Sequence, residues 1–197
     1  MMPAALHTLP LPRHATGLLL ATTMIAGLLL PNVAGAILKT DPLQSTVGAT
    51  FKQLNVPVEA KFKKFTAAID YDPAHPAAAK AHVDIDVASF DLGDPDYNKE
   101  ILKKEWFNAV QFPRASFVSS TIVPGAAGKF TVTGKLTIKG RTADVSFPLT
   151  MKSEAGRQVF DGAVPIKRLT YAIGEGEWKD TSVVADEVVI RFHVVGS

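Results

Sequence analysis

Hydrophobic and polar residues alternate along residues 129–149 (KFTVTGKLTIKGRTADVSFPL). Up to Ile138 every second residue is apolar or glycine, and the residues between them are threonine or lysine. Successive side chains of a strand point to opposite faces, so this strand has one dry and one wet face. Gly140 interrupts the alternation, which resumes from Val145 to Leu149. Because parallel sheets are buried on both faces, the pattern predicts a hairpin of an antiparallel sheet with one face in water.

Similar alternation recurs along most of the chain and gives a count of about eight strands. Eight antiparallel strands with a single wet face close most economically into a barrel, and a two-sheet sandwich is the alternative. The lumen of an eight-stranded barrel is either filled by side chains or holds one small ligand. The other predicted strands cover residues 45–53, 58–71, 80–90, 115–123, 157–169 and 185–195.

The stretch 58–71 changes its parity. Val58, Ala60 and Phe62 share one face of a regular strand, whereas Phe65 and the apolar residues after it share the other. A β-bulge at Lys63-Lys64 would turn both sets inward, and we favour it because bulges bend the strands of curved sheets. The alternative is two short strands separated by a break.

One helix is predicted after Gly93. Asp94 followed by Pro95 is typical of an N-cap with proline at the first helical position. The helix should run to about Phe107, with lysines late in it that suit the helix dipole. Its apolar face would consist of Tyr97, Ile101, Leu102 and Trp106.

Residues 1–36 have the three parts of a cleavable secretory signal peptide. They carry one basic residue and no acid, then an apolar run, then Ala34-Gly35-Ala36. We expect cleavage after Ala36, a domain spanning residues 37–197, and a periplasmic or secreted location. The alternative is a retained membrane anchor, because an apolar stretch of about 16 residues is close to the shortest that spans a bilayer. N-terminal sequencing would distinguish the two.

Composition excludes several classes of protein. The chain has no cysteine, so it forms no disulfide, has no thiolate metal site and carries no lipid on cysteine. Removal of residues 1–36 lowers the formal net charge from +2 to +1. A nearly neutral surface gives no electrostatic footprint for nucleic acid, so no such partner is expected. No stable membrane insertion is expected after cleavage.

Signals for catalysis or metal binding are weak. The sequence contains no G-x-S-x-G elbow, no phosphate-binding glycine loop and no spaced His/Cys cluster, which predicts a protein that is not an enzyme. His82, Asp84 and Asp86 share one strand face and could approach a zinc ion. A single wet strand provides no closed site, however, so we interpret these residues as a solvated face and expect no metal.

Four stretches in order resemble the YceI-like family, the polyisoprenoid-binding, lipocalin-like secreted proteins of bacteria. The resemblance covers essentially residues 41–195, and the family has no short catalytic signature to transfer. The four stretches are STVGATFKQLNVPVEAKFKKF, VDIDVASFDLGDPDYNKEILKKEWFNAVQFPRASFVSS, FTVTGKLTIKGRTADVSFPLTM and TYAIGEGEWKDTSVVADEVVIRF.

The resemblance implies a lipocalin-like antiparallel β-barrel whose lumen holds a long isoprenoid chain, such as a quinone tail or a polyprenyl phosphate. That lipid would be the ligand, and no other cofactor is expected. A polar headgroup could meet Lys61, Lys63 and Lys64 near the predicted bulge, although three solvated lysines are the simpler interpretation. The expected lining is Phe51, Phe62, Phe65, Ile85, Val87, Phe117, Phe130, Val132, Leu136, Ile138, Phe147, Leu149, Ile190 and Phe192.

The alternative is a structural or interaction barrel with a filled core and no lipid. In that case the aromatic residues would pack on one another rather than around a ligand. Trp106-Phe107 could then plug the barrel or join two copies of the chain in a homodimer. The sequence does not separate these two roles.

Overall fold

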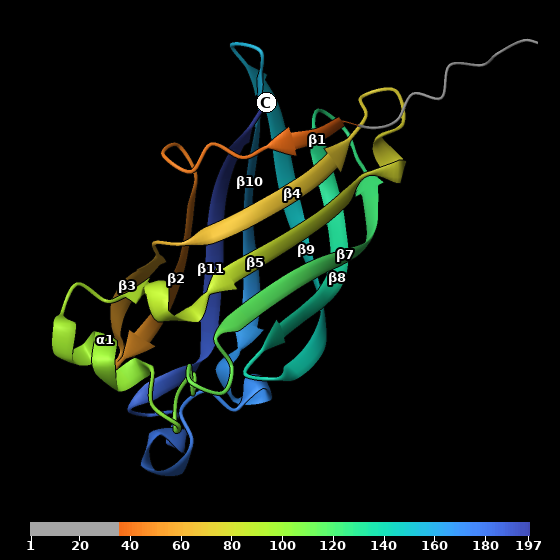
Figure 1. The fold of residues 1–197 in the computed structure, drawn as a ribbon. Helices are drawn as coiled ribbons and strands as arrows, with labels where there is room; N and C mark the ends of the chain where they lie inside the picture. Colours follow the sequence, from red (N-terminus) through yellow and green to blue (C-terminus); the bar gives the residue numbers. More distant parts are fainter. Residues whose placement is uncertain (1–35) are drawn as a thin grey trace, which may run out of the picture. The chain divides into compact units, whose positions relative to one another are not determined.

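The strands form one curled antiparallel sheet in residues 36–197, the part of the chain that this computed structural model describes (Figure 1). The sheet order is β1-β4-β5-β7-β8-β9-β10-β11-β2-β3-β6, and neighbouring strands of the described residues pair antiparallel. The bounds are β1 (Ala36–Lys39), β2 (Thr46–Gln53), β3 (Val56–Phe62), β4 (Phe65–Tyr71), β5 (Lys80–Asp86), β6 (Phe90–Asp91), β7 (Arg114–Pro124), β8 (Lys129–Ile138), β9 (Arg141–Glu154), β10 (Arg157–Lys167) and β11 (Val184–Gly196).

Short helices connect some of these strands. They are η1 (Pro76–Ala78), η2 (Val87–Ser89), α1 (Pro95–Ile101), η3 (Arg168–Tyr171) and η4 (Gly176–Lys179). None of the helices in residues 36–197 is long and apolar enough to span a membrane. The predicted signal peptide lies outside the described residues, except for Ala36, which is the first residue of β1.

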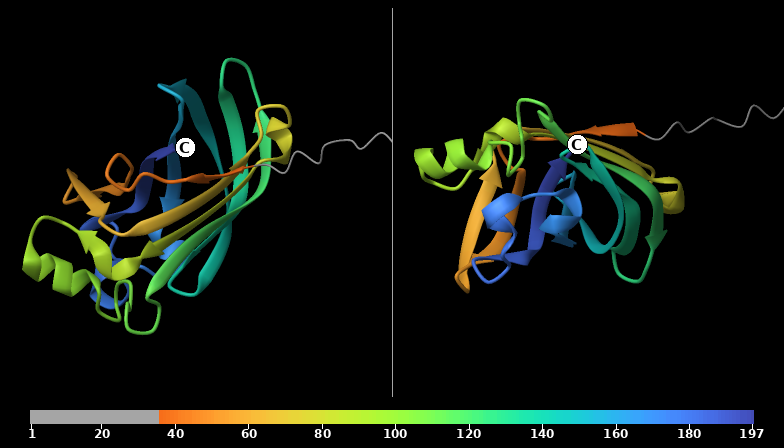
Figure 2. Two further views of the ribbon diagram at one scale, coloured as in Figure 1. Left: turned by 45° about the horizontal axis from the view of Figure 1, so that its top comes forward. Right: turned by 90° about the horizontal axis from the view of Figure 1, so that it is seen from below.

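The predicted all-β antiparallel class is confirmed, although the sheet has eleven strands rather than about eight. The two views of Figure 2 show the sheet curling around an interior. The additional strands come from the short β1 and β6 and from a division of the predicted strand 58–71 into β3 and β4. The number of long strands in the barrel is therefore close to the predicted number.

The predicted bulge at Lys63-Lys64 is wrong, because the chain breaks there into two strands. β3 pairs with β2 and β6, whereas β4 pairs with β1 and β5. The residues at the break therefore connect a strand near one edge of the sheet to a strand near the other edge. Buried Ser89 fixes this corner. Its carbonyl oxygen accepts from the Lys63 N–H at 3.0 Å, and its Oγ accepts from the Lys64 N–H at 3.0 Å. Parity alone could not distinguish a bulge from this break.

A second closure lies at the other end of the barrel. β1 pairs with β4, and just beyond it the backbone meets the end of β11. The Lys39 N–H donates to the Ser197 carbonyl at 2.8 Å, and the Ser197 N–H donates to the Lys39 carbonyl at 3.1 Å. The two ends of the described chain are thus hydrogen-bonded to each other.

The helix begins as predicted but ends early. Asp94 caps it, with Oδ1 accepting from the N–H groups of Asp96 at 2.8 Å and Tyr97 at 3.2 Å. The expected end at Phe107 is wrong, since α1 ends at Ile101. The Phe107 N–H donates back to the Ile101 carbonyl at 3.1 Å, and Asn108 has a positive φ of 49°, so the chain turns instead of continuing. This turn points Trp106 into the protein.

The predicted strand 80–90 is also interrupted. β5 ends at Asp86, and η2 separates it from β6. Asp86 Oδ1 accepts from the Ala88 N–H at 3.0 Å, which caps this turn. The residues of the predicted strand therefore belong to two pairings, β5 with β4 and β7, and β6 with β3.

Asp91 holds α1 against the corner, and this predicts a pH dependence. Hydrogen bonds from Lys63 and Asn98 lower its pKa from 3.8 to about 2. A lowered pKa stabilises the fold above the unfolded value of 3.8, and the stabilisation is lost as the pH falls through about 2. Above about pH 4, the thermal midpoint of wild type should therefore exceed that of Asp91→Asn. The two midpoints should converge near about pH 2. A difference that does not change with pH would contradict this assignment.

Candidate functional site: an apolar cavity inside the barrel

A cavity of about 210 Å³ runs through the interior of the barrel. Tyr71, Trp106, Ser116 and Arg168 are the only described lining residues with an oxygen or nitrogen in the side chain, and none exposes a polar atom to the enclosed space. The cavity exceeds the roughly 150 Å³ that accepts benzene in an engineered core. It is smaller than the roughly 300 Å³ at the low end of drug-sized ligand sites.

The alternation of β8 shows how the sequence builds this wall. Phe130, Val132, Leu136 and Ile138 are buried and line the cavity, whereas the threonines and lysines up to Ile138 face outward. Lys139-Gly140, both with positive φ, then form the two-residue turn into β9. The predicted hairpin is thus confirmed, with its turn at the Gly140 that interrupts the alternation.

Three phenylalanines from alternate strands form a row on the β7–β11 wall. Phe147 of β9 lies in the middle, with ring centroids 5.5 Å from Phe117 of β7 and 5.8 Å from Phe192 of β11. The flanking rings lean over glycines of the strands between them. A Cβ on Gly134 would lie 2.6 Å from Phe117 Cε2, and one on Gly162 would lie 2.6 Å from Phe192 Cε1. The absence of side chains at these glycines allows the rings to lie against the wall.

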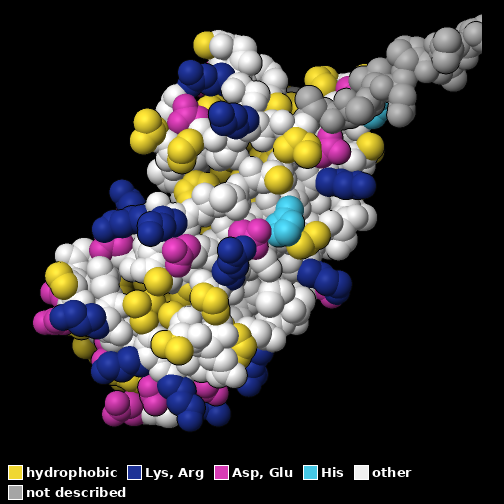
Figure 3. All heavy atoms as spheres, viewed as in Figure 1, with side chains coloured by type: hydrophobic (Ala, Val, Ile, Leu, Met, Phe, Trp, Pro, Cys, Tyr) yellow, Lys and Arg dark blue, Asp and Glu magenta, His cyan; other side chains and the backbone are white. Residues whose placement is uncertain are grey.

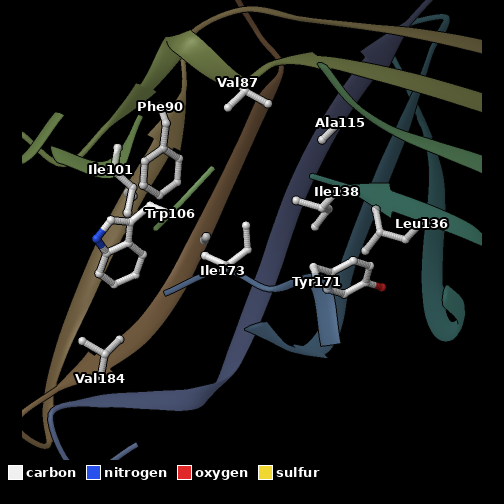
Figure 4. Packing of buried hydrophobic residues seen from close by; sticks show 12 residues of the cluster. Val87, Phe90, Ile101, Trp106, Ala115, Leu136, Ile138, Tyr171, Ile173 and Val184 are labelled. Atoms are coloured by element: carbon white, nitrogen blue, oxygen red, sulfur yellow. The ribbon is translucent and has the colours of Figure 1, made fainter. Parts of the chain in front are cut away.

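Two tryptophans close the end of the cavity near α1. Trp106 is buried and contacts Trp178, with ring centroids 5.3 Å apart. Figure 4 shows Trp106 beside Ile101 and Phe90, with Val184 on its other side. Phe107 also packs toward the interior, with its ring centroid 5.3 Å from that of Phe90. The Trp106-Phe107 segment therefore faces the interior.

Arg168 anchors the loops at this end and is only 3% exposed. All five of its N–H groups donate to backbone carbonyls at 2.7 to 3.1 Å. Desolvation by burial lowers the pKa of Arg168, and the nearby Asp186 carboxylate opposes that change. The guanidinium thus binds backbone and leaves no donor for a ligand. Its acceptors are the carbonyls of Ile173, Gly174, Trp178, Val184 and Ala185.

Lys139 is a second buried cation beside this end. Its Nζ donates to the carbonyls of Lys104 and Ala172 at 2.7 and 2.8 Å and to Glu175 Oε2 at 2.9 Å. The hydrogen bond from Lys139 lowers the pKa of Glu175. Because its three donors are used within the protein, Lys139 is a structural clamp.

All of the predicted lining residues except Phe65 and Val87 lie on the cavity wall. Phe65 instead packs against the Ala67, Phe160 and Val194 cluster, and Val87 lies in the core at 1% exposure. Their assignment to the wall is therefore wrong, although both are directed inward. Whether the remaining residues bind a ligand stays a prediction. Those residues are Phe51, Phe62, Ile85, Phe117, Phe130, Val132, Leu136, Ile138, Phe147, Leu149, Ile190 and Phe192.

Several wall residues were missed. The same alternation could have indicated Val83, Val145, Val164 and Ile166, which lie on strands whose inward faces it predicts. No sequence signal indicated Arg168, because a lone arginine after a strand is usually a surface residue.

The three lysines proposed to meet a headgroup lie outside the cavity wall. Lys61, Lys63 and Lys64 are exposed, and Lys63 Nζ pairs with Asp91 Oδ2 at 2.6 Å. Their contact with a headgroup stays a prediction, but the geometry gives it no support.

The candidate zinc face is occupied by other contacts. His82 Nε2 lies 3.2 Å from Asp84 Oδ2, and Asp86 caps η2. Within residues 36–197 no three His, Cys, Asp or Glu side chains cluster closely enough to hold a metal ion. The face drawn in Figure 3 mixes Lys and Arg with Asp and Glu and has no region of a single charge.

Sequence relatives cover part of this chain. A UPF0312 protein of Yersinia enterocolitica is 31% identical over 125 residues, covering 64% of this chain and 62% of the relative. One from Photorhabdus laumondii is 37% identical over 84 residues, covering 43% of each chain. The match therefore spans less than two thirds of the length of these two relatives.

Solved structures and a family description extend the comparison. BcnA of Burkholderia cenocepacia is 52% identical with a TM-score of 0.78, covering 80% of this chain and 99% of BcnA. A polyisoprenoid binding domain from Saccharophagus degradans is 16% identical with a TM-score of 0.66, covering 82% of this chain and 98% of that domain, and shares the fold. The YceI-like domain matches residues 38–196. The chain belongs to the YceI-like domain family.

Proposed function

We propose that this protein binds a long apolar lipid of the isoprenoid type in its cavity and carries or stores it, without catalysis, in the periplasm or outside the cell. The observation that supports this proposal most is the apolar cavity that exposes no polar atom on its wall among the described residues. Burying a polar group there without a hydrogen bond would cost free energy, whereas a hydrocarbon chain has no hydrogen bonds to lose. The Saccharophagus domain, described as polyisoprenoid binding, has the same fold.

The energetics allow useful affinity from the chain alone. Each buried CH₂ contributes about 0.8 kcal/mol, so about ten buried carbons would approach micromolar affinity before the costs of ordering. At about 210 Å³ the cavity accepts a short segment of such a chain.

Tryptophan fluorescence should report binding, because both tryptophans of the chain lie at the end of the cavity near α1. In Trp178→Phe, only Trp106 emits, and saturable addition of farnesol should shift or quench its emission. Ligand at this end changes the surroundings of the indole, so the change should match the affinity measured by calorimetry. If calorimetry detects binding and the emission stays constant, the ligand does not reach this end.

Native mass spectrometry of protein purified from its own host would identify the natural ligand after solvent extraction. An isoprenoid released in stoichiometric amount would support the proposal. Repeated recovery of empty protein that also fails to bind farnesol would favour the alternative of a filled structural barrel. The inward packing of Trp106-Phe107 favours a plug in either case, and sedimentation of Trp106→Ala would test whether the segment also joins two copies.

The signal peptide is part of this proposal and has its own structural consequence. Cleavage after Ala36 would leave Ile37, Leu38 and Lys39 in β1, which retain their partners Asp70, Ile69 and Ala68 in β4. The mature protein would thus keep most of the strand that closes the barrel. N-terminal sequencing should give Ile37 as the first residue.

A further inference from the structure

A groove with one lysine and three hydroxyl-bearing residues on its wall adjoins the cavity between η1 and β7. It measures about 540 Å³ and shares two wall residues with the cavity, Ala79 and Ile122. Lys80, Ser119, Ser120 and Thr121 contribute an ammonium and three hydroxyl groups to its lining. η1 precedes β5 in the chain, whereas η2 and α1 follow it, so the groove lies at the end of β5 opposite the tryptophans (Figure 1).

We propose that this groove binds the phosphate head of a prenyl phosphate whose hydrocarbon chain occupies the cavity. The inference rests on the proposed function and adds the location and chemistry of the headgroup. An anion cannot be placed on the cavity wall, because no polar atom is exposed there and an unpaired buried charge is costly. The head must therefore lie where the apolar space meets a polar surface.

The end near α1 offers no free buried cation. Arg168 and Lys139 are the two buried cations there, and their donors are already used by backbone carbonyls and Glu175. Lys61, Lys63 and Lys64 are not among the residues that line either space. The groove beside η1 has Lys80 and three hydroxyl-bearing residues on its wall and shares Ala79 and Ile122 with the cavity.

An irregularity in β7 brings hydroxyl-bearing residues to the groove. The register with β8 shifts between Ser119 and Thr121, which leaves Ser120 as an extra residue. Before the shift Phe117 faces the cavity, and after it Ile122 does. The hydroxyl-bearing residues of the shift therefore lie at the boundary between cavity and groove.

Lys80 supplies the positive charge. It is exposed and lies opposite Asp70 in the β4–β5 register, and the ion pairs among residues 36–197 do not include it. Its ammonium can therefore reach a phosphate oxygen without first breaking an ion pair. Serine and threonine hydroxyls can donate to the other oxygens.

Calorimetry with farnesyl phosphate, farnesol and inorganic phosphate tests the headgroup site. Lys80→Gln should weaken binding of farnesyl phosphate about fivefold, the effect of one partly solvated charge contact, and leave farnesol unchanged. Thr121→Val should weaken binding of farnesyl phosphate by a smaller factor. Lys52→Gln, which replaces an exposed lysine of β2 that lines neither the cavity nor the groove, is the matched control and should change neither affinity. Inorganic phosphate, which lacks the chain, should not bind measurably.

The outcomes separate the two proposals. If wild type binds both prenyl probes but Lys80→Gln affects them equally, or Lys52→Gln has as large an effect, the headgroup site is wrong and the lipid-binding function stands. If inorganic phosphate binds as well as farnesyl phosphate, the groove is an anion site independent of the cavity, which also overturns the inference. If wild type binds neither prenyl probe, both proposals are wrong.

Discussion

Replacing Arg168 with leucine is expected to lower the free energy of unfolding by about 3–5 kcal/mol. The substitution leaves five backbone carbonyls without their donors at a site that is 97% buried. Each orphaned acceptor that stays buried costs about 1–3 kcal/mol, and relaxation of the loops recovers part of the sum. Chemical denaturation would measure the loss, and the thermal midpoint should fall by roughly 10 °C.

Two variants control this experiment. Arg168→Lys keeps the charge but has three donors in place of five. Its free energy of unfolding should therefore lie between those of wild type and Arg168→Leu. Arg157→Leu removes a half-exposed arginine whose Nη1 lies 3.6 Å from Asp41 Oδ2, and should cost less than about 1 kcal/mol. If Arg157→Leu and Arg168→Leu are equally destabilising, the carbonyl cluster is not the reason for the effect.

Gly162→Val should weaken farnesol binding about tenfold or more while the protein stays folded. A Cβ at this position would lie 2.6 Å from Cε1 and 3.1 Å from Cε2 of Phe192, and the added methyl groups enlarge the clash. Because the three nearest neighbours of that Cβ are all atoms of this ring, the ring must move toward the cavity. Gly134 is a poorer choice, since a Cβ there would also meet the Val118 carbonyl oxygen.

The second variant removes the obstructing ring. Gly162→Val/Phe192→Ala should recover farnesol binding, because the added methyl groups then occupy space that the ring has left. Ala163→Val places the same side chain on the outer face of β10, opposite Arg191, and should leave the affinity unchanged. Calorimetry gives the affinities, and circular dichroism verifies the fold. Unchanged binding by Gly162→Val would mean that the ligand does not pass this row of phenylalanines.

The sequence predicted best where one physical rule acts alone. In β8 the alternation identifies every inward residue, because burial on one face is the only requirement. At Lys63-Lys64 the same rule shows that something changes but cannot say what, since a bulge and a break both restore inward packing. The break reflects a long-range need to join β2–β3 to β4–β5, which no local pattern records.

The site was less predictable than the fold. Phe65 and Val87 satisfy the inward parity yet pack against neighbours, because the distance from the cavity depends on how the strands curve. Arg168 acts through backbone carbonyls within residues 173–185, and Gly162 acts through the Phe192 ring on the neighbouring strand β11. Such roles depend on three-dimensional contacts that composition and periodicity do not encode.

The pairing of β2 with β11 has a consequence for the order in which the chain can fold. Thr46 at the start of β2 lies opposite His193 near the end of β11, almost the whole domain away in sequence. Contacts between distant residues slow folding, because a large loop must close before they form. A nascent polypeptide would therefore hold its first long strand without this neighbour until synthesis is nearly finished, and truncation within β11 should abolish the native state rather than trim it.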